Sequence, residues 1–379
     1  MVRSTLVTSS LSTYASSTRR RSSVASTNLT DDLISSAIDE AAEALLQRPN
    51  HHWVVAFSGG KDSTAALKVI LAAHRKSGLG KLRLSVIYCD TGVENPILDL
   101  YVKSALNRLQ QEFDQWGLGF ATTLLQAPVQ DRFFVRIVGR GYPPPTNSFR
   151  WCTNGLRIRP VSRFIAAQDP AQTVLVLGLR QSESQQRDRS LKKASFSKWQ
   201  KQTEGNKDYD LYLPILNLGV PEVWDAVFWL SKPRSIDPAT LEKLYRDASG
   251  ECPVIKAPTA PPCASGRFGC WTCTVVRKDK SAKKLIDAGY EDLRPYFEFR
   301  NWLAEIRNDP SMRWPTRRNG TPGLGPFTLE ARKMILQRID ALEVRTRTEI
   351  VDSSERGVIA GLWEVDEFAR LNFKGISAV

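Results

Sequence analysis

The sequence predicts an α/β protein with a doubly wound parallel sheet, followed by a Cys-rich, mostly helical C-terminal region. Three observations lead to this prediction. Short apolar runs alternate with segments of helical periodicity up to about residue 231, a glycine-rich turn separates the first run from the helix that follows it, and four of the six cysteines fall within the 22 residues that end at Cys273. Strands that alternate with helices form parallel sheets covered on both faces, and such sheets bind ligands at the carboxyl ends of their strands.

The elements are expected in a regular order along the chain. Apolar residues at helical spacing predict helices, and short apolar runs between turn residues predict strands. The expected helices are 31–48, 63–74, 95–116, 157–167, 281–306 and 328–346, and the expected strands are 53–57, 82–88, 120–125, 173–177 and 210–213.

Three parts of the chain differ in composition. Residues 1–30 contain 15 Ser or Thr, four Arg and no acidic residue. This composition is typical of a disordered tail, although an organelle transit peptide or a mistaken start codon would look the same. Residues 31–235 are expected to form the sheet domain, and residues 236–379 the Cys-rich and helical domain.

Composition and charge narrow the class of protein. The chain is 42% hydrophobic and 25% charged, as in globular proteins, and has no apolar run long enough to span a membrane. Its net charge of +13 favours a polyanionic partner, although a merely basic surface is the alternative. Six cysteines are too few for a disulfide scaffold. None of the three histidines lies near the cluster of four cysteines, which favours thiolate ligands in a reducing cytoplasm.

The glycine-rich turn has the residues of a phosphate-binding site. Glycines let the backbone approach an anion, and the amides at a helix N-terminus carry partial positive charge. Hydroxyls and a lysine add further donors, and the spacing is not that of the Walker motif. The turn comprises Ser58, Gly59, Gly60, Lys61, Asp62, Ser63 and Thr64. It resembles the S-G-G-x-D-S signature of PP-loop ATP pyrophosphatases, which implies that 31–235 is a PP-loop domain that cleaves ATP to AMP and pyrophosphate.

Two downstream segments resemble the phosphoadenylylsulfate-reductase-like branch of this family. Asp90 and Glu94 follow the second expected strand, where carboxylates could hold Mg²⁺ or position the nucleotide. A solvated turn with a helix-capping carboxylate is the plainer interpretation. The second segment resembles a G-x-R-x-x-E-S-x-x-R element and contains Gly178, Arg180, Glu183 and Arg187. Its two arginines would bind phosphate bidentately.

The cysteines predict a metal site. Cys270 and Cys273 form a Cys-x-x-Cys pair, Cys263 lies seven residues upstream, and Cys152 is remote in sequence. Four thiolates suit either a [4Fe–4S] cluster or zinc, and simple buried cysteines are a further alternative. Cys89 directly follows a strand and is expected to be a packing residue rather than a sulfur relay.

The cysteine segment carries a closer resemblance. Residues 267–276, together with segments around Cys152, Cys252 and Trp302, resemble DndC-type sulfurtransferases of DNA phosphorothioation, and the likeness runs from about residue 30 to about residue 345. It implies a [4Fe–4S] cluster on Cys152, Cys263, Cys270 and Cys273, with Cys252 competing for the role of Cys263. It also implies ATP, Mg²⁺, double-stranded DNA as substrate, a cysteine desulfurase as sulfur donor, and other phosphorothioation subunits as partners. The tail 1–30 departs from this family.

The resemblance assigns catalytic roles to Lys61, Asp62, Arg180 and Arg187. DNA contacts are expected in two basic segments with interleaved aromatics, since such segments bind the backbone and stack on bases. They contain Lys192, Lys193, Lys198, Trp199, Lys201 and Lys207, and Arg313, Trp314, Arg317 and Arg318. No helix-turn-helix or zinc-finger spacing for base recognition is found in the sequence.

Three other functions compete with this interpretation. A sulfonucleotide reductase needs a reactive C-terminal cysteine, and the sequence has none after Cys273. An RNA thiolase fits the basic charge equally well. A non-catalytic DNA-binding iron–sulfur subunit would not require the intact Lys61-Asp62-Ser63 sequence.

Overall fold

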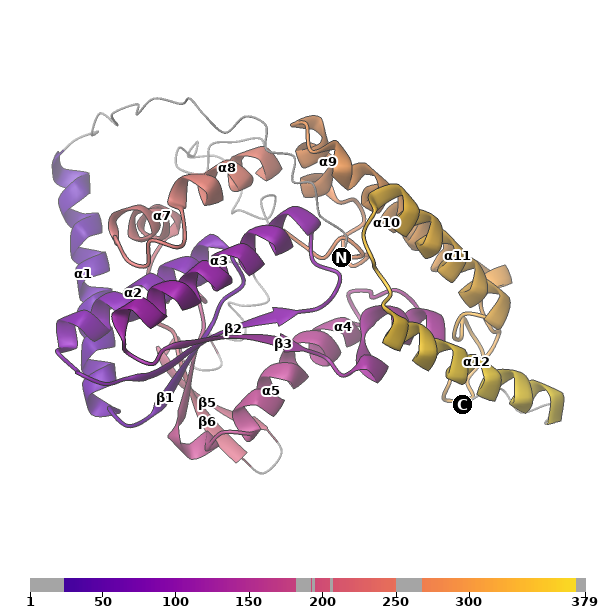
Figure 1. Cartoon of the computed structure of the whole chain (residues 1–379), viewed down its shortest axis with the longest axis horizontal. Coiled ribbons are helices and arrows are strands. Elements are labelled where there is room, and N and C mark those ends of the chain that lie inside the picture. The colour runs from indigo at the N-terminus through magenta and orange to yellow at the C-terminus, as the bar shows by residue number, and fades with distance from the viewer. Residues whose placement is uncertain (1–23, 182–191, 193–194, 205–206, 250–267, 373–379) are drawn as a thin grey trace.

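The computed structural model describes residues 24–181, 192, 195–204, 207–249 and 268–372 (Figure 1). Several predicted residues lie outside these ranges, so their predictions stay untested. They are Glu183, Arg187, Lys193, Cys252 and Cys263.

A six-stranded sheet forms the centre of the N-terminal part. Its strands are β1 (His52–Ala56), β2 (Arg83–Asp90), β3 (Ala121–Gln126), β4 (Thr173–Val176), β5 (Trp199–Glu204) and β6 (Lys207–Tyr212). Their order is β3-β2-β1-β4-β6-β5, and all neighbours are parallel except β5 and β6. The predicted parallel sheet is therefore confirmed, with one antiparallel strand added at its edge. The sequence of β5, Trp-Gln-Lys-Gln-Thr-Glu, has the polar character of an edge strand and lacks the apolar run that predicts a buried one.

Helices account for most of the remaining described chain. Apart from six short 3₁₀ or π-helical segments, the helices of the described ranges alternate with the strands and then follow one another in the C-terminal part (Figure 1). They are α1 (Val24–Gln47), α2 (Lys61–Ser77), α3 (Pro96–Trp116), α4 (Trp151–Thr153), α5 (Arg159–Ala166), α7 (Val220–Trp229), α8 (Pro238–Ser249), α9 (Lys280–Asp287), α10 (Arg294–Ile306), α11 (Leu329–Thr346) and α12 (Ser353–Asn372). Helix α1 begins at Val24, inside the segment 1–30 that was expected to be a disordered tail. Residues 24–30 are therefore helical and do not belong to such a tail.

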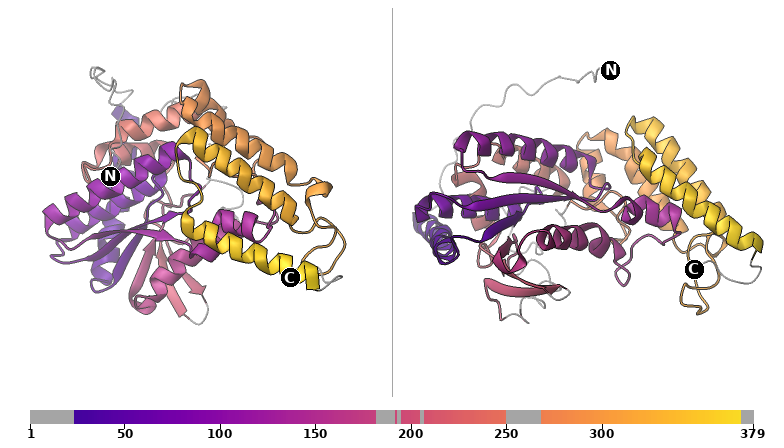
Figure 2. Two further views of the ribbon diagram at one scale, coloured as in Figure 1. Left: turned by 45° about the vertical axis from the view of Figure 1, so that its right-hand side comes forward. Right: turned by 60° about the horizontal axis from the view of Figure 1, so that its bottom comes forward.

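The sheet is covered on both faces, because successive side chains of a strand point to opposite sides. Trp53 and Val55 of β1 belong to the larger core, with residues of α1, α2, α3 and α7. Val54 points the other way and packs with Leu175 and with Ile165 of α5. The doubly wound arrangement is thus confirmed, and it places the carboxyl ends of the parallel strands at one edge (Figure 2).

The C-terminal helices pack around a second core. Phe299 of α10, Ile335 of α11 and Ile359 of α12 are buried there together with Phe134 and Trp271. The mostly helical character predicted for this region is confirmed for its described residues. None of the helices in the described ranges is long and apolar enough to cross a membrane.

A titrating group at the start of β1 gives a test of this fold. His52 is buried, with its Nε2 2.8 Å from Ser85 Oγ, and burial lowers its pKa from 6.5 to about 4. Below pH 6.5 His52 is protonated in the unfolded chain but stays neutral in the folded chain. The free energy of unfolding therefore falls as the pH drops towards 4. We expect His52→Gln to reduce the loss of unfolding free energy between pH 7 and pH 4.5 by about 2 kcal/mol.

Urea unfolding of both proteins at the two pH values measures this difference. His51→Gln is the matched control, because His51 is only partly buried and its substitution should change the pH dependence less. Equal pH dependence in His52→Gln and the unmodified chain would contradict the prediction.

Candidate functional site

The phosphate-binding turn lies between β1 and α2, at the carboxyl edge of the sheet (Figure 1). Gly59 has a φ of +72°, and a Cβ atom added there would lie 2.1 Å from Val102 Cγ2 on α3. Only glycine satisfies both the backbone angle and this close approach. The predicted glycine-rich turn therefore has a steric reason for its sequence.

Two serine hydroxyls hold the turn in shape. Ser63 Oγ accepts the Ser58 N–H at 3.1 Å, donates to the Gly60 carbonyl at 2.9 Å, and lies 3.1 Å from Ser58 Oγ. The N-cap residue of α2 is Gly60, which has no side chain with which to cap the first amides of the helix. Thr64 is buried, and no described residue hydrogen-bonds its Oγ1. Uncapped amides at the start of a helix are what a phosphate group requires.

A buried ion-pair network lies beside the turn. Asp62 accepts Lys61 Nζ at 2.6 Å through Oδ2 and Arg180 Nε at 2.7 Å through Oδ1. Burial raises the pKa of the Asp62 carboxyl, but the charges and hydrogen bonds of Lys61 and Arg180 outweigh burial and hold that pKa below its usual value. Two cations and one anion leave net positive charge at the turn, which favours binding of a polyphosphate.

Gly178, at the end of β4, packs directly against this network. A Cβ atom added at Gly178 would lie 2.6 Å from the Asp62 carbonyl oxygen and 2.8 Å from the Ser63 nitrogen. The structure thus brings together Lys61, Asp62, Gly178 and Arg180, which the sequence predicted as site residues.

Tyr245 of α8 belongs to the site and was not predicted. Its hydroxyl accepts the Lys61 backbone N–H at 3.2 Å, and Lys61 Nζ lies 5.7 Å from the centre of its ring. The ring also packs edge-on against Phe268 and Trp224. Sequence gave no signal for Tyr245, because it lies 184 residues from its partner and in no motif.

Asp90 is buried at the end of β2 and caps no helix, since Asn95 is the N-cap residue of α3. Its carboxylate accepts Gly92 N–H at 2.9 Å and Gln126 Nε2 at 3.0 Å, and pairs with Lys103 Nζ at 3.0 Å. Burial raises its pKa, but these partners outweigh burial and lower it. The carboxylate is therefore held as an anion that orders the turn after β2.

Glu94 lies beside a cysteine. Its carboxylate accepts Thr91 Oγ1 at 2.8 Å and Arg157 Nη2 at 3.1 Å, and Cys270 Sγ lies 3.7 Å from its Oε2. Arg157 Nη2 is also 3.7 Å from Cys270 Sγ. The residue that was expected near Mg²⁺ thus forms part of the surroundings of the Cys-x-x-Cys pair.

The Cys-x-x-Cys loop is anchored on both sides. Trp271 N–H donates to the Val93 carbonyl at 3.0 Å, which ties the loop to the turn after β2. From α10, Arg300 Nε donates to the Cys273 carbonyl at 2.9 Å, and Arg307 Nη1 donates to the Thr274 carbonyl at 2.9 Å. Burial raises the pKa of the Cys270 thiol to about 12, so its sulfur is protonated unless a metal or another electrophile displaces the proton.

The predicted metal ligands are only partly covered by the structure. Burial raises the pKa of Cys152, and Cys152 and Cys270 both pack against the second core. Within the described ranges, no three His, Cys, Asp or Glu side chains are grouped to hold a metal ion. Thiols are soft ligands that fit an iron–sulfur cluster, but the fourth predicted ligand, Cys263, lies outside the described residues.

Cys89 behaves as a packing residue. Its thiol is half-buried and donates to the Arg157 carbonyl at 3.7 Å, and burial raises its pKa to about 11. A protonated thiol of this kind is a poor nucleophile.

Part of the expected DNA-contact set is structural instead. Trp199 packs against Trp53 and Tyr212, with the Arg48 guanidinium 3.8 Å from its ring centre. Arg313 is buried and donates to the carbonyls of Gly325 and Arg307. These two predictions are wrong, because spacing alone did not show that both side chains face the interior. Trp314 remains 40% exposed, as base stacking would require.

A phosphate-binding turn at the carboxyl edge of a mostly parallel, doubly covered sheet defines a nucleotide-binding enzyme of the PP-loop type. The sequence match agrees with this class. The phosphoadenosine phosphosulfate reductase domain family matches residues 52–275, more than half of the chain, and the chain belongs to this family.

Individual relatives are more distant. An uncharacterised protein of Methanocaldococcus jannaschii is 27% identical over 131 residues, which cover 35% of this chain and 23% of that protein. FMN adenylyltransferase of Candida glabrata, solved with FAD and pyrophosphate, is 14% identical with a TM-score of 0.37, over 82% of each chain. Phosphoadenylyl-sulfate reductase of Candida auris is 12% identical with a TM-score of 0.33, over 55% of this chain and 86% of that one. These scores are too low to support a function.

The close packing of Gly178 predicts a loss of nucleotide binding on substitution. In Gly178→Ala the new methyl group meets backbone atoms of Asp62 and Ser63, which cannot withdraw without moving the turn. We expect at least about tenfold weaker ATP binding, equivalent to about 1.4 kcal/mol, measured by calorimetry with a non-hydrolysable ATP analogue. Gly80→Ala is the matched control, since a Cβ atom there meets no atom within 4 Å. Unchanged affinity in Gly178→Ala would contradict this account of the turn.

Proposed function

We propose that this chain is an ATP-dependent sulfurtransferase that adenylylates a phosphate of the DNA backbone and replaces one of its oxygens with sulfur. One observation carries the proposal. The phosphate-binding turn with its Lys61–Asp62–Arg180 network and the Cys270 loop are both attached to the carboxyl edge of the sheet, the loop through the Trp271–Val93 backbone bond. An activation site and thiols on one edge suit a reaction that joins phosphate activation to sulfur chemistry.

The described residues suggest how activation proceeds. The amides and hydroxyls of residues 58–64 bind the β and γ phosphates of ATP, and Mg²⁺ supplies further charge neutralisation when bound. A non-bridging oxygen of DNA attacks the α phosphorus, and pyrophosphate leaves into the turn. Lys61 and Arg180, oriented by Asp62, stabilise the negative charge that develops, and Arg187 is expected to add to them.

Sulfur insertion completes the reaction. A sulfur nucleophile attacks the adenylylated DNA phosphorus, a P–S bond forms, and AMP leaves with the oxygen that it had acquired. The family resemblance proposes a cysteine desulfurase as the source of the sulfur, other phosphorothioation subunits as partners, and the cytoplasm as location. The net charge of +13 supports a polyanionic substrate such as double-stranded DNA.

A [4Fe–4S] cluster on Cys152, Cys263, Cys270 and Cys273 is part of the proposal. When bound, it would supply electron-transfer or sulfur-handling chemistry. The chain's own contribution is to orient Cys270 between Glu94 and Arg157 and to fix the loop through Arg300 and Arg307.

A sulfonucleotide reductase is the second candidate, because the family match is to the reductase domain. The two functions differ in their products. The reductase releases sulfite from phosphoadenylylsulfate with a thiol reductant, whereas the sulfurtransferase forms AMP and pyrophosphate only with ATP and an acceptor. Sulfite release without any DNA-dependent AMP formation would replace the proposal with this candidate.

The proposed role of the ion-pair network predicts a large loss of activity. We expect Lys61→Ala to lower DNA-dependent AMP and pyrophosphate formation by about 100-fold, the usual loss on removing one charge-stabilising donor. Asp62→Asn should also lower it, because the carboxylate that orients Lys61 and Arg180 loses its charge. Lys81→Ala, at an exposed position before β2, is the control and should keep full activity. Phosphorothioate content of digested DNA, measured by mass spectrometry, provides a second readout. Full modification with Lys61→Ala would rule out a catalytic role for the turn.

The cluster predicts metal content. Protein purified without oxygen should contain about four irons and four acid-labile sulfides per chain and absorb broadly near about 400 nm. Cys270→Ser should lose most of this iron, whereas Cys89→Ser should keep it, because Cys89 donates to the Arg157 carbonyl and is not one of the proposed ligands. Zinc without sulfide in the purified protein would contradict the assignment of an iron–sulfur cluster.

A further inference from the structure

Arginine is concentrated in the part of the chain that follows β3. Residues 132–168 contain seven arginines and no acidic residue, although 40 acidic residues in a chain of 379 correspond to about four in a stretch of this length. The stretch follows the carboxyl end of β3, so it begins at the edge of the sheet that carries the phosphate-binding turn. Among its arginines, the proposed reaction uses only Arg157, which lies beside Cys270. A block of one charge sign is typical of an interaction surface.

A second segment without acidic residues packs against the first. Residues 313–327 contain three arginines and no Asp or Glu. The Phe327 N–H donates to the Gly141 carbonyl at 2.7 Å, and Arg318 Nη2 donates to the Arg140 carbonyl at 2.6 Å. The fold thus joins two basic segments whose contacting arginines are 178 residues apart in sequence.

Four arginines of these two segments are exposed and have no ion pair with a carboxylate of the described residues. They form what we call the arginine surface, namely Arg140, Arg150, Arg317 and Arg318. Asp366 of α12 acts on Arg318, but it is already paired with Arg332 at 2.6 Å. Like charges gathered on one face repel one another, and a polyanion bound among them removes that repulsion.

Aromatic rings hold part of the arginine surface in place. The Arg318 guanidinium lies 4.4 Å from the centre of the Tyr142 ring, and Tyr142 stacks on Phe149 with ring centres 6.2 Å apart and planes 16° from parallel. A guanidinium has five N–H donors, and among the described residues the Arg140 carbonyl takes one of those of Arg318. An arginine fixed in this way loses little side-chain entropy when its other donors bind an anion.

The arginine surface is joined to the Cys-x-x-Cys loop. Thr274 Oγ1 donates to the carbonyl of Pro145, which lies between Arg140 and Arg150 in the chain, at 2.8 Å. Cys152 follows Arg150 by two residues. A polyanion held by the arginine surface would therefore lie beside the proposed cysteine site.

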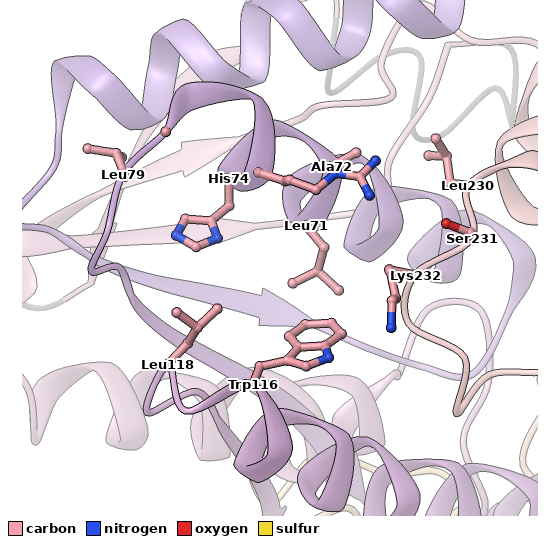
Figure 3. Close-up of a pocket in the computed structure, with 11 residues that line it drawn as sticks. Leu71, Ala72, His74, Leu79, Trp116, Leu118, Leu230, Ser231 and Lys232 are labelled. Atoms are coloured by element: carbon pink, nitrogen blue, oxygen red, sulfur yellow. The ribbon is translucent and has the colours of Figure 1, made fainter.

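A pocket of about 330 Å³ at the C-terminal end of α2 is less suitable for a polyanion (Figure 3). Its walls are mainly apolar and include Leu71, Trp116 and Leu118. Lys232 on its far side lies 3.6 Å from Glu112 Oε1, so its charge already has a partner. A phosphate backbone needs several exposed cations, and the arginine surface supplies them.

We propose that the arginine surface binds the phosphate backbone of double-stranded DNA and positions it beside the Cys270 loop. Arg317 and Arg318 were expected to contact DNA from the sequence, and Arg140 and Arg150 are new members of the site. Phosphate contacts fix the register of a duplex but carry no sequence information, so this surface binds DNA regardless of base sequence. The choice of DNA as the polyanion rests on the proposed function, whereas the site itself rests on the exposed arginines without carboxylate partners.

The salt dependence of DNA binding tests the proposal, because it counts the phosphates that the protein neutralises. Fluorescence anisotropy of a short labelled duplex, titrated with the full chain at a series of NaCl concentrations, gives the slope of log K against log salt concentration. We expect this slope to become less negative by about 0.9 for each of Arg140→Gln, Arg150→Gln and Arg318→Gln, and by about 2.7 in the triple variant. Arg150→Lys keeps the charge and should keep the slope.

Arg345→Gln is the matched control. It also removes one positive charge, but Arg345 lies in the last turn of α11, at the opposite end of that helix from residues 313–327, and pairs with Glu298. Its slope should equal that of the unmodified chain. Thermal unfolding of each variant checks that it is folded.

The outcomes separate this proposal from the proposed function. Equal slopes for the triple variant and the unmodified chain would overturn the assignment of the surface, whereas DNA-dependent AMP formation would still support the sulfurtransferase. Tighter binding of an RNA duplex of the same sequence would overturn DNA as the partner. At saturating DNA the triple variant should form AMP as fast as the unmodified chain, because these arginines bind the substrate and take no part in phosphoryl transfer. A loss of that maximal rate with unchanged DNA affinity would contradict the proposal.

Discussion

The bidentate pairing of Asp62 with Lys61 and Arg180 is the interaction on which the rest of the site depends. Lys61 and Asp62 lie at the start of α2, after β1, and Arg180 lies after β4. The network therefore joins the carboxyl ends of the neighbouring strands β1 and β4. Removing one member of such a buried set leaves another charge uncompensated, which costs about 3–5 kcal/mol in proteins. The same network leaves the turn with net positive charge. The stability of the turn and the affinity of the turn for polyphosphate therefore both depend on this network.

The C-terminal region is attached to this edge by polar contacts of the main chain. The Cys270 loop binds the turn after β2 through Trp271 and binds α10 through the guanidinium groups of Arg300 and Arg307, which reach its carbonyl oxygens. The buried rings of Trp271 and Phe299 pack between these two attachments. Loop backbone needs such partners, since its own carbonyls have no regular structure to pair with.

The sequence predicted the parts of the protein that depend on local pattern. The turn at residues 58–64 and the parallel strands followed from spacing and residue type, because neighbours in a motif remain neighbours in the fold. Tyr245 and strand β5 could not be predicted, since each is defined by a partner distant in sequence. Trp199 and Arg313 were misplaced for a related reason: a basic or aromatic segment looks the same whether its side chains face solvent or the interior.

The position of Tyr245 has a thermodynamic consequence. Its hydroxyl occupies the Lys61 amide, one of the donors that a nucleotide phosphate would use, so the phosphate can take that amide only when the hydroxyl gives it up. Helix α8 carries Tyr245 and ends at Ser249, just before the segment that contains Cys252 and Cys263. Any binding event that shifts α8 must then change the affinity for nucleotide, and nucleotide must change that event by the same factor, because linkage between two sites is reciprocal.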